Sequence, residues 1–103
     1  MASGGRRDEV DTRLKAWEEE LELLRVRLAA GAEALHAKHG ATFQELYRRK
    51  ETLRSRWEAI RGVYRPEPEA VRRFEEALAA MEAAWSTAEP MVGEVLGMQP
   101  RPR

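Results

Sequence analysis

An unbroken heptad pattern in the first third of the chain limits what this chain can fold into. Its members are spaced 4-3-4-3-4-3-4 and are Val10, Leu14, Trp17, Leu21, Leu24, Leu28, Gly31 and Leu35. On an α-helix this spacing places the side chains on one narrow stripe, which another helix has to cover. The pattern therefore predicts helices packed on helices and favours a helical bundle or coiled coil over a sheet protein.

Two later segments repeat the pattern and predict further helices. The second stripe is Phe43, Leu46, Lys50, Leu53, Trp57, Ile60 and Tyr64, and the third is Val71, Phe74, Leu78, Met81, Trp85 and Ala88. The second stripe is displaced by one residue from the frame of the first. Gly40 lies between the two frames, and the segment Thr42–Glu45 that follows has the form of a capping box. We therefore predict a turn at Gly40.

The prolines and glycines place the other boundaries. Pro66 and Pro68 interrupt the chain before the third stripe, and Pro90 breaks or kinks the last helix. The expected helices cover residues 7–39, 43–64 and 69–88, with a short helical turn over 90–96. Together they form one domain over residues 7–96, with flexible ends at 1–6 and 97–103.

Reversing the chain at these boundaries predicts which residues face one another. Trp17 then meets Tyr64, and Trp57 meets Phe74. The predicted fold is an all-α antiparallel three-helix coiled-coil bundle. If the first two helices are continuous through Gly40, the alternative is a long-helix antiparallel coiled-coil dimer.

The first expected helix is longer than its partner. It would span about 50 Å against about 33 Å for the second helix, at 1.5 Å per residue. Its first turns would then lack a partner within the chain. We therefore expect a homo-oligomer that self-associates through Val10, Leu14 and Trp17.

Charge is balanced overall but uneven along the chain. There are 18 Lys and Arg against 18 Asp and Glu, with arginines concentrated in the second expected helix. The predicted register brings this helix beside the first and forms a patch of Arg25, Arg27, Arg54 and Arg56. Such a patch supports an alternative function, that of an adaptor or regulator that binds nucleic acid or an acidic protein partner. Nucleic acid is the less favoured partner, because the chain has no net positive charge and no aromatic interleaving.

The sequence contains little that indicates catalysis, a cofactor or a metal. Cysteine is absent, and the pair Glu33 and His36 occurs once, whereas a di-iron bundle needs that motif twice. We expect no enzyme activity, no cofactor and no metal site, with His36 and His39 solvated at a helix end. The N-terminus lacks the apolar core of a signal peptide, and no apolar stretch approaches ~20 residues. A cytoplasmic protein without stable membrane insertion is expected, and reversible membrane-surface association is a further alternative.

Three segments resemble a known family. These are residues 14–24 (LKAWEEELELL), residues 43–54 (FQELYRRKETLR), and Phe74–Leu78 through the pair Ala84-Trp85. Over residues 8–88 the chain resembles a family of small bacterial coiled-coil stress-response proteins first known from cyanobacteria. That family has no established biochemical activity. The resemblance implies a stress-associated helical protein, and it implies no site residues. The leading functional hypothesis is a non-enzymatic coiled-coil structural or interaction protein, to which the resemblance adds the association with stress.

Overall fold

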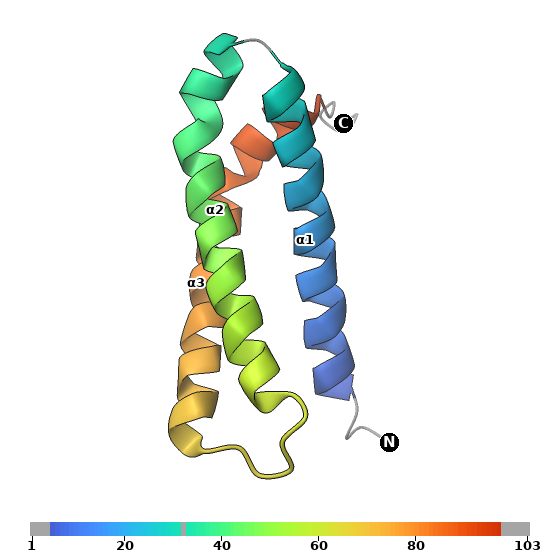
Figure 1. Cartoon of the computed structure of the whole chain (residues 1–103), viewed down its shortest axis with the longest axis vertical. Helices are drawn as coiled ribbons and strands as arrows, with labels where there is room; N and C mark the ends of the chain where they lie inside the picture. Colours follow the sequence, from blue (N-terminus) through green and yellow to red (C-terminus); the bar gives the residue numbers. More distant parts are fainter. Residues whose placement is uncertain (1–4, 32, 98–103) are drawn as a thin grey trace, which may run out of the picture.

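The computed structural model describes residues 5–31 and 33–97, which form three helices. These are α1 (Gly5–Ala30), α2 (Glu33–Ile60) and α3 (Pro68–Leu96). Consecutive helices run antiparallel and pack against each other (Figure 1). The predicted all-α three-helix bundle is therefore confirmed. The ends expected to be flexible lie outside the described residues at 1–4 and 98–103, while α1 already begins at Gly5.

The first turn lies at Gly31 and not at Gly40, which corrects the predicted helices over 7–39 and 43–64. A Cβ at Gly31 would lie 2.9 Å from the backbone oxygen of Arg27, so the close approach at this turn requires glycine. At Gly40 a Cβ would meet only the His36 ring at 3.6 Å, an ordinary contact within α2. The helix runs through Gly40 without interruption. The long-helix dimer does not follow, because the chain reverses nine residues earlier.

The turn at Gly31 makes the helices nearly equal in length, at 26, 28 and 29 residues. Each spans about 39–44 Å, so no helix extends far beyond its neighbours. Val10, Leu14 and Trp17 are consequently buried within the chain, with 4%, 0% and 8% of their surface exposed. The overhang on which we based self-association through these three residues does not exist.

The register between α2 and α3 is the predicted one, whereas that between α1 and α2 is different. Trp57 and Phe74 face each other with ring centroids 5.0 Å apart, as expected. Trp17 does not meet Tyr64, because Tyr64 lies beyond the end of α2 and is 91% exposed. Instead the Trp57 indole donates a hydrogen bond to Asp11 Oδ1 at 2.6 Å. Because the turn lies at Gly31, nine residues before the predicted Gly40, every pair of residues that face each other between α1 and α2 differs from the predicted one.

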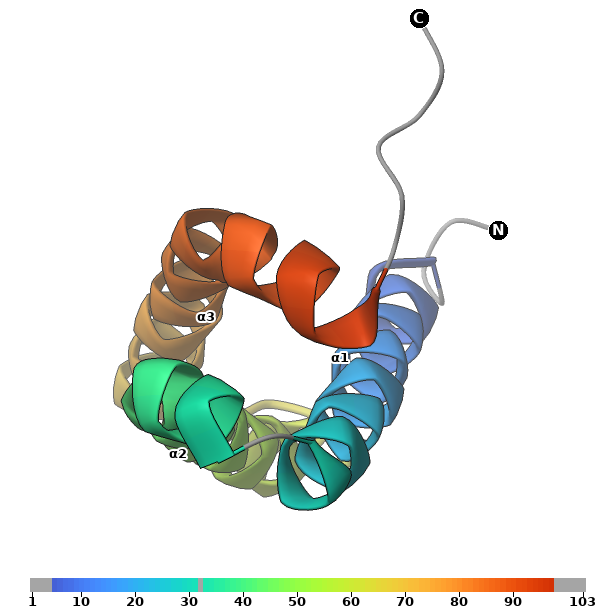
Figure 2. The same cartoon turned by 90° about the horizontal axis from the view of Figure 1, so that it is seen from above.

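α3 is a single helix that includes Pro90, which corrects the expected division into 69–88 and 90–96. Proline removes one backbone donor, and the last turns of α3 bend across the end of the bundle toward α1 (Figure 2). Arg27 Nη1 donates to the carbonyl oxygen of Leu96 at 3.1 Å and joins the ends of the two helices. Gly97 then ends the helix in the left-handed conformation, with φ of 69°.

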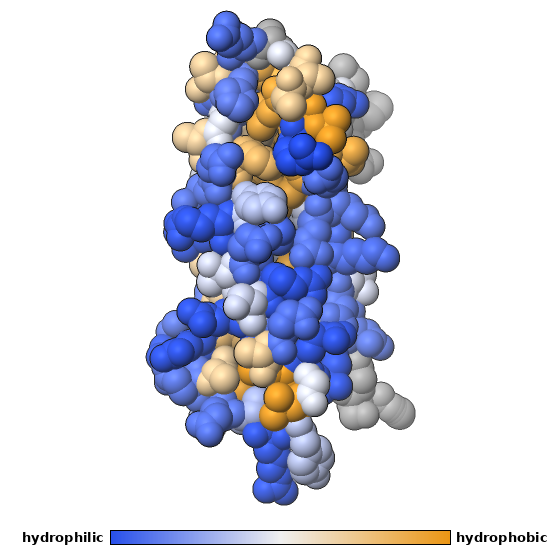
Figure 3. Space-filling model, in the orientation of Figure 1, coloured by the Kyte–Doolittle hydropathy of each residue, from blue (hydrophilic) through white to orange (hydrophobic). Residues whose placement is uncertain are grey.

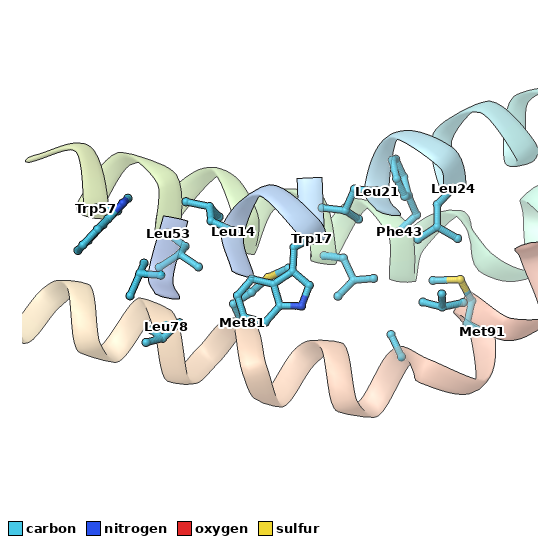
Figure 4. Close-up of a cluster of buried hydrophobic side chains, with 14 of the residues drawn as sticks. Leu14, Trp17, Leu21, Leu24, Phe43, Leu53, Trp57, Leu78, Met81 and Met91 are labelled. Atoms are coloured by element: carbon cyan, nitrogen blue, oxygen red, sulfur yellow. The ribbon is translucent and has the colours of Figure 1, made fainter. Parts of the chain in front are cut away.

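One apolar core runs along the bundle axis, and all three helices contribute to it (Figure 4). Most residues of the three predicted stripes are in it. Those that the heptads missed are Met91, Val92 and Val95, beyond Pro90. They cover the end of the core at which α1 turns into α2.

Candidate functional site

The surface between α2 and α3 carries a groove made of two adjoining hollows. One has a volume of about 560 Å³ and the other of about 340 Å³, and both are lined by Arg49 and Ala80. We call them the alanine half and the arginine half of the α2–α3 groove. The alanine half is lined by Ala41, Thr42, Glu45, Leu46, Arg49, Ala80, Ala83, Ala84, Thr87 and Ala88. The arginine half is lined by Arg48, Arg49, Thr52, Arg56, Arg73, Glu76, Ala77 and Ala80.

Small side chains create the alanine half. Ala80, Ala84 and Ala88 follow one another at four-residue intervals on α3, and Ala83 lies beside them. An alanine fills so little space that the groove stays open down to Leu46, which is fully buried beneath it. Small residues on a helix surface allow another helix to approach closely, so the alanine half has a shape in which a further helix can pack.

The arginine half carries an excess of positive charge. The arginines of the groove are Arg48, Arg49, Arg56 and Arg73, against two glutamates, Glu45 and Glu76. Glu45 accepts hydrogen bonds from Arg48 Nη2 at 2.8 Å and Arg49 Nε at 2.6 Å, and these bonds lower the pKa of its carboxyl. Glu76 is bonded by Arg72, and Arg73 reaches Glu69 at 3.2 Å.

Arg56 lies in the same half with no ion-pair partner within residues 5–31 and 33–97. Arginine presents several donors in a planar fork that suits carboxylate and phosphate oxygens. The arginine half therefore has unused capacity to bind an acidic group.

The four arginines of the predicted patch do not share one flank. Arg25 pairs with Glu22 on its own helix, and Arg27 binds the carbonyl oxygen of Leu96 at the end of α3. Arg54 lies between α1 and α2, where Glu18 accepts two of its hydrogen bonds at 2.8 and 3.0 Å. Of the four arginines in the predicted patch, only Arg56 lines the α2–α3 groove. The prediction failed because it used the register of a turn at Gly40.

Of the two histidines expected to be solvated at a helix end, His36 is exposed in the first turn of α2, whereas His39 is placed differently from the prediction. His39 is buried, with its Nε2 3.1 Å from Glu94 Oε1 on α3. Partial burial raises the pKa of Glu94, but the bond from His39 and the charge of Lys38 outweigh it and leave that pKa lowered. Within the described ranges, no three His, Asp or Glu side chains gather as metal ligands would.

The surface formed by α1 and α2 is hydrophilic along most of its middle (Figure 3). Apolar residues gather near the end at which α1 turns into α2. A hollow of about 340 Å³ there is lined partly by Leu28, Ala29 and Phe43. None of the described helices is both long and apolar enough to span a membrane.

Comparison with known proteins identifies no relative of this chain. No family model, curated protein or solved structure matches it. The basis for a functional proposal is therefore the surface itself.

The sequence contains a signal for this groove that the predicted arginine patch did not take into account. Ala77, Ala80, Ala84 and Ala88 recur on one side of α3, and Arg48, Arg49 and Arg56 recur on one side of α2. Placing both sets on one surface needs only the α2–α3 register, which was predicted correctly. The predicted patch paired the arginines of α2 with those of α1 instead.

Proposed function

We propose that this protein is a non-enzymatic helical interaction module whose α2–α3 groove binds an amphipathic helix of a protein partner. The partner helix carries apolar side chains for the alanine half and acidic side chains for the arginine half. The supporting observation is that two adjoining hollows join an open, alanine-lined surface to an arginine cluster. This cluster includes Arg56, which has no ion-pair partner among the residues that the structure describes. Grooves between helices commonly bind amphipathic helices in this way.

A helical partner suits the groove better than nucleic acid. Arg48, Arg56 and Arg73 line the arginine half only, Arg49 lies where the two halves meet, and the alanine half is lined mostly by apolar side chains. A nucleic acid backbone needs positive charge along its whole track. An acidic helix needs it only where its carboxylates lie.

Binding of a designed peptide tests this proposal. The probe is a fluorescein-labelled helical peptide of about four turns, with leucines along one half of a face and glutamates along the other. We expect Arg56→Glu to weaken binding about tenfold or more, because it turns an attraction into a repulsion, and we expect added salt to weaken binding to the wild type. Fluorescence anisotropy measures both effects.

The matched controls are a peptide with lysines in place of the glutamates and the variant Arg65→Glu. Arg65 is exposed in the segment between α2 and α3 and lies outside the groove, so this variant makes the same charge change elsewhere. The proposal is wrong if the acidic peptide does not bind, or if Arg56→Glu and Arg65→Glu bind it equally well.

A further inference from the structure

The outer face of α1 carries an exposed stripe that neither α2 nor α3 covers. Lys15, Glu19, Leu23, Val26 and Ala30 are spaced 4-4-3-4, and every one of them is exposed. Leu23 and Val26 are 54% and 47% exposed, although both are large apolar residues. Lys15 and Glu19 have no ion-pair partner within the part of the chain that the structure describes. We call these five residues the outer stripe of α1.

The order of residues along this stripe matches the order along the α2–α3 groove. In α1 Glu19 precedes Val26 by seven residues, which is about 10 Å along the helix. In α2 Thr42, in the alanine half, precedes Arg49, where the alanine and arginine halves meet, by the same seven residues. A helix laid antiparallel to α2 with Val26 over the alanine half therefore brings Glu19 to the arginines.

The rest of the stripe also fits in this register. Leu23 lies over the alanine half near Ala84, which leaves room for its side chain. Lys15 lies one helical turn before Glu19 on the bound helix and is placed near Glu76 in the arginine half. Each charged residue of the stripe thus meets a side chain of opposite sign, and each large apolar residue meets the apolar half.

We propose that the helix bound in the α2–α3 groove is the outer stripe of α1 from a second copy of this chain. This inference rests on the proposed function, because it names the occupant of the same groove. The two surfaces lie on different parts of the bundle, so one copy cannot fill its own groove. Pairing one groove with another in a symmetric dimer is disfavoured, because arginines would face arginines or the alanine half.

The contact is consequently heterologous: each copy offers both a stripe and a groove. Such contacts propagate into open chains or close into rings, and they do not stop at an isologous dimer. Val10, Leu14 and Trp17 take no part, since they are buried in the core. Self-association of this kind therefore uses residues other than those first expected.

Two full-length variants separate the two surfaces. The stripe variant is Leu23→Glu with Val26→Gln, and the groove variant is Ala83→Glu with Arg56→Glu. All four residues are exposed, so both variants are expected to keep the wild-type helix content by circular dichroism. The matched control is Ala79→Glu with Arg65→Glu, which makes the groove variant's changes at exposed positions outside the groove.

Sedimentation velocity over a concentration series provides the test. We expect the mass of the wild type and of the control to rise with concentration beyond a dimer, and each variant alone to be a monomer. An equal mixture of the two variants should form a 1:1 dimer and nothing larger, because one intact stripe and one intact groove remain.

The inference is overturned if the wild type is a monomer at every concentration, or if the variants associate as the wild type does. It is equally overturned if the mixture of variants stays monomeric. The labelled acidic peptide distinguishes this failure from a failure of the proposed function. If the wild type is a monomer but binds the peptide in the groove, only the second copy is wrong as the occupant.

Discussion

Asp11 is the residue that holds α1 to the end of α2. Its carboxylate accepts one hydrogen bond from Trp57 Nε1 at 2.6 Å and another from Arg61 Nη2 at 2.7 Å. The bond from Arg61, followed by that from Trp57, lowers the pKa of the Asp11 carboxyl. Arg61 is 39% exposed, so water screens the charge pair, and the buried indole is the partner that depends most on Asp11.

We expect Asp11→Asn to destabilise the fold by about 1 kcal/mol at neutral pH, since a charged acceptor is replaced by a neutral one. A lowered pKa in the folded state means that the stabilisation by Asp11 is complete above the ordinary carboxyl pKa of about 4. It is lost as the pH falls through the lowered value. Urea unfolding followed by tryptophan fluorescence measures the free energy of unfolding at each pH. The difference in this free energy between wild type and variant should be constant from pH 7 to 5 and should become smaller below pH 4. A constant difference down to pH 2 contradicts this assignment.

At the scale of the helices, the heptad pattern predicts that the chain turns between the first two helices but does not determine at which residue. The frame changes by one residue between Leu28 and Phe43, and both Gly31 and Gly40 lie in that interval. Extending the second frame backward from Phe43 reaches His39, which is buried on the α2 face with the rest of that stripe. The pattern was therefore compatible with either glycine. Equal helix lengths favour Gly31, because they leave no apolar stripe uncovered.

Alanine substitution at the two glycines should have opposite effects. Gly40→Ala is expected to stabilise the protein by about 0.5–1 kcal/mol, because Gly40 lies inside a helix with room for a Cβ. Gly31→Ala is expected to destabilise it by about 1 kcal/mol, because the backbone has to move away from the Arg27 oxygen. Denaturant unfolding monitored by circular dichroism measures both changes. A turn at Gly40 would reverse the two signs.

At the scale of the whole molecule, the bend at Pro90 converts the end of α3 into a cover for the core. Met91, Val92 and Val95 are 5–6% exposed, so they belong to the core and not to an appended helical turn. Arg27 and His39 bond to this segment from α1 and α2. The end of the bundle at the Gly31 turn is thus closed by residues from all three helices.

Removing one of these apolar side chains should therefore lower the free energy of unfolding as much as a substitution elsewhere in the core does. We expect Met91→Ala to lower the free energy of unfolding by about 2–3 kcal/mol, from lost burial and the cavity that remains. Val63→Ala, at an apolar residue that is 44% exposed, is the control and should change it by less than about 0.5 kcal/mol. Equal effects of the two substitutions, in thermal or urea unfolding, would show that the last turns of α3 do not cover the core.

The sequence by itself determined an all-helical fold, the apolar faces of the helices and the pairing of α2 with α3, but not where the helices begin and end. Heptad spacing is a local property, and the prolines between α2 and α3 left little freedom in where that reversal lies. Only the tertiary structure decided which glycine makes the first turn, and with it which charges of α1 and α2 meet. It also decided that Pro90 bends α3 and does not end it. The position of the first turn and the bend at Pro90 both depend on how the three helices together fill one apolar core along its whole length. A local sequence pattern does not contain this information. The α2–α3 groove follows from the register that the sequence did contain, and its two halves became visible only when both helices were placed side by side.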